Sequence, residues 1–424
     1  MRFTVAITGR RIVLAGLAGV LGALAVSYSG LVSIAANTGH FAIVEWFLHT
    51  TMRNAVRTQS LQYSLPEGID LSDPVLVQRA AGHFASSCAS CHGAPGVAQS
   101  PAVLAMMPPP PRLEGQIGRW EDRELFWIGQ HGIKYSGMPA WVSQDRPDEV
   151  WSMVAFLRAL PGMTPEAYRA LALGGDDAAG PPSGLSTAGF DGGFESSLAD
   201  CARCHGLDGL GTGVDGTQDA FPAIAGQSEA YLFEALKAYA RGDRTSGIMQ
   251  TAAGIHDDAR LAELAAYYAD QPRVGTTRQI AAPAGATLGY SLGAKPVREA
   301  IAPDAPTQEP APSGPAGMLD PAAPHGRPLS AQGLADLGER IATQGLLERK
   351  LGACQSCHDG GADRNPAYPS LAGLPEWYIA AQLQLFKEEE RGGGPFAHLM
   401  TPIAIHLTDE QIDALALWYS LQAP

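Results

Sequence analysis

Three stretches of the chain carry apolar side chains at the spacing i, i+3, i+6 and i+7, which places them on one face of a helix. They are Val150, Met153, Phe156 and Leu157, then Leu261, Leu264, Tyr267 and Tyr268, then Ile412, Leu415, Trp418 and Tyr419. We expect each stretch to be the last helix of a repeated unit and to pack on the first helix of that unit. The pattern predicts an all-α fold.

A different pattern occupies the N-terminus, where residues 12–35 carry no charge. This length can span a bilayer. Arg2, Arg10 and Arg11 precede the stretch, so we expect the N-terminus to stay in the cytoplasm. A cleaved signal peptide is the alternative, although the apolar core is long for one and lacks a clear small-residue cleavage site.

The segment FAIVEWFLHTTM follows the uncharged stretch and begins at Phe41. Its Trp46 and Phe47 suit the boundary between lipid and water, so we expect a helix lying on the membrane surface. The alternative is a helix packed on the first globular domain.

Composition narrows the class of protein. The 424 residues correspond to about three domains. An apolar content of 46% supports folded cores rather than a disordered chain. The formal charge of −14 argues against a nucleic-acid-binding surface.

All six cysteines fall into three Cys-x-x-Cys pairs, and a histidine follows each pair directly. The cysteines are Cys88, Cys91, Cys201, Cys204, Cys354 and Cys357, and the histidines are His92, His205 and His358. This motif is typical of c-type haem attachment. Thiols one helical turn apart can form thioethers with the two haem vinyl groups, and the next imidazole can bind the iron.

Two other chemistries use paired cysteines. A redox-active pair does not require the trailing histidine. A zinc site would need a further ligand at a repeated spacing. The motifs therefore predict three covalently bound haem c groups.

A methionine lies at a similar distance after each histidine. Met138, Met249 and Met400 follow the histidines by 46, 44 and 42 residues. We expect them to be the second axial iron ligands, since methionine ligation raises the haem potential. Competing ligands remain: Met106 and Met107 for the first haem, His256 for the second and His398 for the third.

A proline recurs between each histidine and its methionine, at Pro111, Pro222 and Pro369. A ligating histidine usually donates its second N–H to a backbone carbonyl, which fixes the orientation of the ring. We expect these prolines to supply that carbonyl. The alternative is that each proline only ends a loop.

With these motifs, all three units resemble class I cytochrome c domains. The second and third resemble the two halves of cytochrome c4: AIAGQSEAYLFEAL from Ala223 matches SLAGLPEWYIAAQL from Ser370. The first resembles the single-haem domain of membrane-anchored bacterial cytochromes c, with its GMPAW methionine loop. The resemblance implies three class I cytochrome c domains in tandem, built from short helices around each haem, behind an N-terminal transmembrane helix.

The motifs and the loop composition divide the chain. We expect a membrane anchor and interfacial helix in residues 1–60, haem domains in 61–172, 189–272 and 331–424, and linkers in 173–188 and 273–330. Residues 272–328 contain 11 prolines, which indicates a semi-extended tether. Cytochromes c4 join their halves by a short connection, so this tether puts a close face-to-face packing of the second and third domains in question.

The resemblance implies an electron carrier rather than an enzyme, because histidine plus methionine leave no open position at the iron. A haem peroxidase would need a five-coordinate iron. We expect a single-pass protein of the bacterial inner membrane with its haem domains in the periplasm. It would relay electrons from a respiratory donor, such as a quinol-oxidising complex or dehydrogenase, to a terminal oxidase or reductase.

The alternative is the cytochrome subunit of a periplasmic flavin- or quinone-dependent dehydrogenase complex. The chain contains no flavin or nucleotide motif, so the catalytic subunit would be a separate protein.

Overall fold

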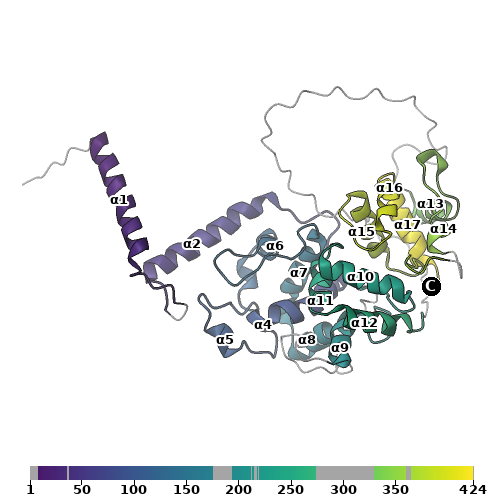
Figure 1. The fold of residues 1–424 in the computed structure, drawn as a ribbon, viewed down its shortest axis with the longest axis horizontal. Coiled ribbons are helices and arrows are strands. Elements are labelled where there is room, and N and C mark those ends of the chain that lie inside the picture. Colours follow the sequence, from purple (N-terminus) through teal and green to yellow (C-terminus); the bar gives the residue numbers. More distant parts are fainter. Residues whose placement is uncertain are drawn as a thin grey trace, which may run out of the picture.

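The computed structural model describes residues 8–35, 38–174, 193–211, 213, 217, 219–273, 329–359 and 364–423. In these ranges the chain is helical, and its only β structure is isolated bridges (Figure 1). The predicted all-α fold is confirmed. The predicted linkers, residues 173–188 and 273–330, lie mostly outside the described residues.

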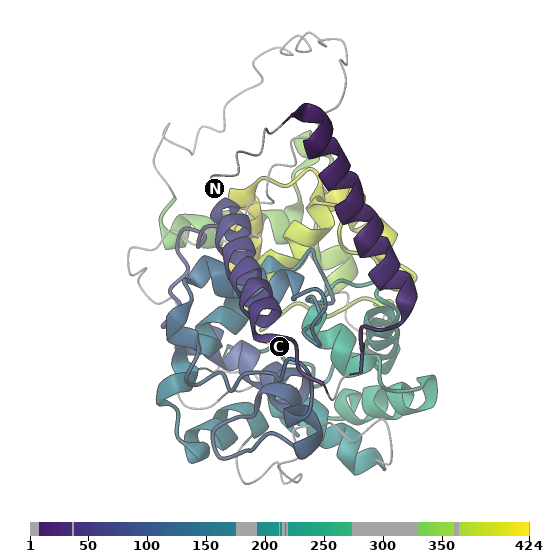
Figure 2. The same cartoon turned by 90° about the vertical axis from the view of Figure 1, so that its left-hand side faces the viewer.

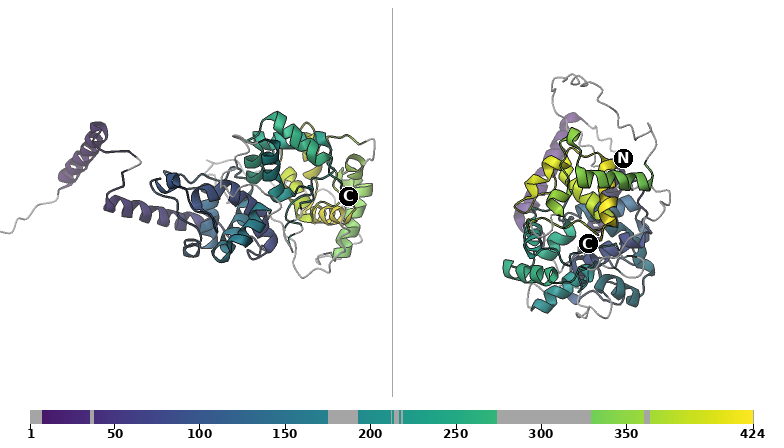
Figure 3. Two further views of the ribbon diagram at one scale, coloured as in Figure 1. Left: turned by 90° about the horizontal axis from the view of Figure 1, so that it is seen from below. Right: turned by 90° about the vertical axis from the view of Figure 1, so that its right-hand side faces the viewer.

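The N-terminal region consists of α1 (Gly9–Ser29) and α2 (Ala42–Gln59). Helix α1 buries no residue and is long and apolar enough to cross a membrane, as a signal sequence also can be. It stands apart from the helical body in Figures 1 and 3. The C-terminal half of α2 contacts the first domain. Val56 is buried there, and Arg57 Nε lies 3.8 Å from Glu124 Oε1.

The first domain contains six α-helices: α3 (Pro74–His83), α4 (Ala89–His92), α5 (Pro101–Leu104), α6 (Asp122–His131), α7 (Pro147–Ala159) and α8 (Pro165–Leu173). Its core is aromatic, with Phe84, Trp151, Phe156 and Tyr168 almost fully buried. Asp73 caps α3, because its side chain accepts a hydrogen bond from the Val75 N–H at 2.8 Å. Pro74 occupies the first helical position, where its missing N–H leaves no donor unsatisfied.

The second and third domains repeat one arrangement. The second contains α9 (Phe194–His205), α10 (Glu229–Arg241), α11 (Gly247–Ala253) and α12 (Asp258–Ala269). The third contains α13 (Ala331–Gln344), α14 (Gln355–His358), α15 (Glu376–Lys387), α16 (Thr401–Ala404) and α17 (Asp409–Leu421). Short irregular helices η1 (Ser60–Gln62), η2 (Phe84–Cys88), η3 (Ile117–Arg119), η4 (Leu160–Gly162), η5 (Leu347–Arg349) and η7 (Ala397–Leu399) connect the longer ones.

The three predicted apolar faces belong to α7, α12 and α17, and each packs on the first helix of its domain as expected. The partners are α3, α9 and α13. In the third domain the crossing is close at Gly338, where an added Cβ would meet the Ala414 carbonyl oxygen and would lie 2.7 Å from Trp418 Cβ. Helices α13 and α17 can approach this closely because position 338 has no side chain.

The second and third domains pack directly on each other, although the long tether had put a close packing in question. Gln227 donates to the Ser370 carbonyl at 2.8 Å and accepts from the Ser370 N–H at 2.9 Å. Trp377 Nε1 donates to the Asp219 carbonyl at 2.6 Å, and Arg273 donates to the Ala372 carbonyl at 2.6 Å. A long connection does not prevent this contact, because the entropic cost of closing a loop grows only slowly with its length.

The first domain contacts both of the others, and Figure 2 shows the three domains gathered behind α1 and α2. The Arg79 guanidinium lies 3.6 Å from the centre of the Trp377 ring in the third domain. A Cβ added to Gly82 of α3 would lie 2.8 Å from Cys204 Sγ, so α3 runs directly beside the second attachment motif.

A substitution at Gly338 tests the close helix crossing. Gly338→Ala should destabilise the packing of α13 on α17 by about 1–3 kcal/mol, because the methyl group overlaps backbone atoms. Gly333→Ala on the same helix is the control, since a Cβ at this position would lie 3.4 Å from Ser330 Oγ, an ordinary contact distance. Hydrogen exchange in peptides covering the two helices measures the effect. Equal exchange in the two variants would contradict the described crossing.

Candidate functional site

Each Cys-x-x-Cys-His motif lies at the end of a helix, because α4, α9 and α14 all stop at the histidine. Five of the six cysteines are partly buried, Cys357 is exposed, and none forms a disulfide. After His92 and His205 the chain turns through Gly93 and Gly206 with φ of 70° and 75°, a conformation that favours glycine. Each histidine thus sits where the helix gives way to a loop.

The three predicted hydrogen bonds between histidine and proline are present. In each pair the histidine Nδ1–H donates to the proline carbonyl oxygen. The Nδ1···O distance is 2.8 Å for His92 and Pro111, 3.1 Å for His205 and Pro222, and 2.9 Å for His358 and Pro369. Because a carbonyl can only accept, Nδ1 carries the proton and Nε2 keeps its lone pair. The haem roles of these histidines and prolines remain predictions.

Burial favours the same form of each ring. It lowers the pKa of His92, His205 and His358, and the hydrogen bond to the proline carbonyl opposes this only in part. A neutral imidazole with a free Nε2 is the form that binds iron. The protein therefore holds each of the three histidines in the neutral form that a metal ligand requires.

The three predicted methionine ligands occupy different local structures. Met138 lies in the loop after α6, where its N–H donates to Ser136 Oγ at 3.2 Å and its carbonyl accepts from the Ile133 N–H. Met249 is in α11, and Met400 directly precedes α16. All three side chains are half-buried.

Two residues, Met106 and His256, remain alternatives to Met138 and Met249 as the second axial ligand. A Cβ added to Gly137 would lie 2.6 Å from the terminal methyl of Met106, so this side chain reaches the loop of Met138. His256 Nε2 is buried and has no hydrogen-bond partner among the described residues. Met138 and Met249 remain predictions on the strength of the repeated spacing.

Comparison with known proteins matches all three units. Residues 76–157 match the family model described as cytochrome C oxidase, cbb3-type, subunit III, and residues 192–270 and 335–418 match cytochrome c. A thiosulfate dehydrogenase electron acceptor from Thiomonas intermedia is 30% identical over 225 residues, which cover 53% of this chain and 79% of that protein. The chain belongs to the cytochrome c family.

Two further relatives extend the comparison. Cytochrome c4 from Stutzerimonas stutzeri is 25% identical over 52% of this chain and 84% of that protein. The solved thiosulfate dehydrogenase from Marichromatium purpuratum is 26% identical with a TM-score of 0.36. That match covers 52% of this chain and only 36% of the other. The protein is a multi-haem c-type cytochrome, with homology to cytochrome c4 and to thiosulfate dehydrogenase cytochromes.

An arginine pair between the second and third domains, buried Arg244 and half-buried Arg391, fits the chemistry of haem. Arg244 and Arg391 form an antiparallel bridge, and both are hydrogen-bonded to tyrosines, Arg244 to Tyr378 at 2.7 Å and Arg391 to Tyr231. Among the described residues, the polar groups that act most on this pair are tyrosines and Gln382 rather than carboxylates. Arg244 Nε also lacks a partner.

Removing two neighbouring cations from water beside tyrosines rather than carboxylates is costly. Haem carries two propionate groups, so a pair of haems supplies anions of the required charge. The donor set at this interface therefore fits the cofactor, in addition to the thiols and the imidazoles.

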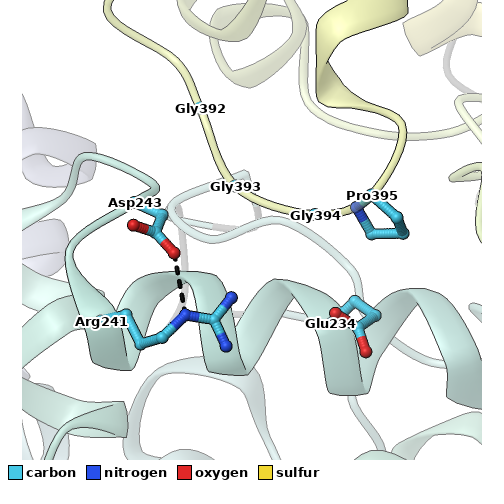
Figure 4. Close-up of a pocket in the computed structure, with 7 residues that line it drawn as sticks. All are labelled: Glu234, Arg241, Asp243, Gly392, Gly393, Gly394 and Pro395. Carbon is cyan, nitrogen blue, oxygen red and sulfur yellow. Dashed lines mark hydrogen bonds and ion pairs between the residues drawn. The ribbon is translucent and has the colours of Figure 1, made fainter.

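Two cavities lie near the same interface. The larger, about 530 Å³, is an open groove between α10 and the loop Gly392–Pro395, lined on the α10 side by Glu234 and the Arg241–Asp243 ion pair (Figure 4). It contains no residue of an attachment motif. The smaller, about 390 Å³, includes Gln355 of the third motif.

Sequence reasoning missed several residues that support the sites. Gln99 Nε2 donates to the carbonyls of Cys91 and Pro110, both at 2.8 Å, and so ties the first motif to the proline segment. Arg244 and Arg391 were also missed. The repeat could have revealed them, because they are separated by the same interval as Tyr231 and Tyr378.

Replacement of Met249 tests the ligand assignment. Met249→Ala should remove about a third of the Met–Fe(III) charge-transfer absorbance of the oxidised protein and lower one haem potential. Met163→Ala is the control, because Met163 packs against the core of the first domain. An intact band in Met249→Ala would make His256 the ligand instead.

Proposed function

We propose that the chain is a trihaem electron carrier. Each Cys-x-x-Cys pair would hold one haem c covalently, the following histidine would bind its iron, and the proline carbonyl would orient that histidine. Met138, Met249 and Met400 would complete the coordination. The observation that carries this proposal is the threefold recurrence of a histidine fixed through Nδ1 at the end of an attachment motif.

The haem supplies a reversible one-electron change, and the protein supplies the ligands and a dry setting for it. Two protein ligands at each iron leave no position for a substrate. The chain is therefore an electron carrier, and any catalytic step belongs to a partner protein.

The partners follow from the relatives. Part of this chain resembles proteins described as electron acceptors of thiosulfate dehydrogenase, and the first domain matches a subunit of a cbb3-type oxidase. We infer that the second and third domains receive electrons from a periplasmic dehydrogenase of the thiosulfate-oxidising class. The first domain then passes them toward a terminal oxidase. This combines the respiratory relay and the dehydrogenase subunit that the sequence suggests.

The N-terminal helices would hold this relay at the inner membrane, with the haem domains in the periplasm. Helix α1 has the length and hydropathy of a membrane span. Phe41, Trp46 and Phe47, at the start of α2, are 83%, 61% and 58% exposed. Aromatic side chains exposed beside a membrane span favour insertion at the lipid interface.

Removal of single haems tests the relay. The variant Cys88→Ala/Cys91→Ala should carry one haem fewer and should still be reduced by a thiosulfate dehydrogenase with thiosulfate. Oxygen uptake through oxidase-containing membranes should fall at least about tenfold, because the path to the oxidase is cut. Spectra of the two remaining haems check that the other domains are intact. Unchanged oxygen uptake, or loss of reduction by the donor, would contradict the proposed direction.

Membrane attachment gives a separate prediction. The full-length protein should require detergent for extraction, and its N-terminal peptide should begin near Met1. A variant starting at residue 61 should be soluble, since it lacks both exposed helices. A mature protein that starts between Ser27 and Thr38 and is soluble would show that α1 is a cleaved signal.

A further inference from the structure

Glu149 is a buried carboxylate at the contact between the first and second domains. It lies in the first turn of α7 and is 6% exposed. A buried charge is tolerated only where hydrogen bonds satisfy it. Its donors come from both domains: Trp141 and Arg146 from the first, Ser246 and Gly247 from the second. All four partners are donors, so the ionised carboxylate is the form that satisfies them.

On the side of the second domain, Glu149 reaches the backbone of Met249. Ser246 Oγ donates to Glu149 Oε1 at 2.6 Å and accepts from the Met249 N–H at 3.0 Å. The Gly247 N–H donates to Glu149 Oε2 at 2.7 Å. A two-step chain of hydrogen bonds thus joins a carboxylate of the first domain to the methionine segment of the second.

On the side of the first domain, Glu149 holds Trp141, which lies three residues after Met138 in the same loop. Trp141 Nε1 donates to Glu149 Oε2 at 3.1 Å. The Trp141 ring is buried, and its centre lies 4.8 Å from the centre of the His83 ring. An added Cβ at Gly247 would overlap the Trp141 indole. The loop of Met138 and the start of α11 therefore touch at this point.

Arg146 is the cationic member of the cluster and contacts both domains. Its guanidinium lies 3.0 Å from Glu149 Oε1, pairs with Asp148 at 2.7 Å, and donates to the Thr245 carbonyl at 3.1 Å. Charged hydrogen bonds are stronger than neutral ones, so this cluster fixes the two methionine segments relative to each other.

We propose that Glu149 is a positioning residue that couples the Met138 and Met249 segments, and so sets the surroundings of the first and second haems together. The proposal rests on the assignment of both methionines as ligands. Removing the carboxylate leaves Trp141, Ser246 and Gly247 without their shared acceptor. Both segments then loosen. The donors to Glu149 come from the first and second domains, and the third domain meets the edge of the cluster through the Glu390 carbonyl, which accepts from Thr245 Oγ1 at 3.1 Å.

The test compares Glu149→Gln with Glu166→Gln in the full-length protein. Glutamine keeps the shape of Glu149, but it removes the charge and turns one acceptor oxygen into a donor. Glu166 is the control because its side chain is 73% exposed and its ion pair with Arg169, at 3.7 Å, is a surface contact.

The first measurement is hydrogen exchange, which does not depend on the irons. Glu149→Gln should accelerate exchange at least about tenfold in peptides 136–145 and 246–254, and leave peptide 397–407 within about twofold of the wild type. Glu166→Gln should change none of the three. Acceleration in all three peptides, or in none, would overturn the proposal.

The second measurement is a redox titration that resolves the haems. Two potentials should shift in Glu149→Gln while the third stays fixed. Ser246→Ala removes the hydroxyl that links Glu149 to Met249 but leaves Glu149 its contacts with Trp141, Arg146 and Gly247. It should therefore shift one potential and loosen only peptide 246–254. Altered exchange with all potentials unchanged would make Glu149 a purely structural contact. If Met249→Ala left its charge-transfer band intact, the ligand assignment would fail independently of the exchange result.

Discussion

The hydrogen bond from a histidine Nδ1 to a proline carbonyl is the constraint that all three cytochrome c units share. It assigns the proton to Nδ1, leaves the Nε2 lone pair free for iron, and fixes the plane of the ring. The surroundings of the motif differ among the domains. A glycine follows the histidine in the first and second, whereas Asp359 follows it in the third. The hydrogen bond is kept in each case, so the orientation of the histidine ring does not depend on how the helix ends.

Polar groups, most of them buried, make specific contacts between the three domains. Arg244 and Arg391 lie between the second and third domains, and Glu149 lies between the first and second. Such groups bring little net stability but specify one arrangement, because a shifted interface would leave charges buried and unpaired. Fixed domain positions suit an electron relay, since transfer between haems requires them to stay close.

The sequence was sufficient for features that repeat within each domain. The apolar faces of α7, α12 and α17 and the histidine–proline contacts follow from local spacing, which a single chain displays directly. Contacts between domains could not be predicted in this way. Glu149 follows Asp148 at the start of a helix, where acidic residues are common for local electrostatic reasons. Its partners Ser246 and Gly247 lie almost a hundred residues away and leave no mark in the pattern. The proline-rich tether put a close packing of the second and third domains in question, but its composition describes the connection and not the surfaces that it joins.

The number of haems bound to one chain tests the central claim most directly. The intact mass of the denatured protein, together with a pyridine haemochrome assay, should report three covalent haems per chain, one for each attachment motif. A count of two would remove one domain from the relay. A count of zero would contradict haem attachment at these cysteines altogether.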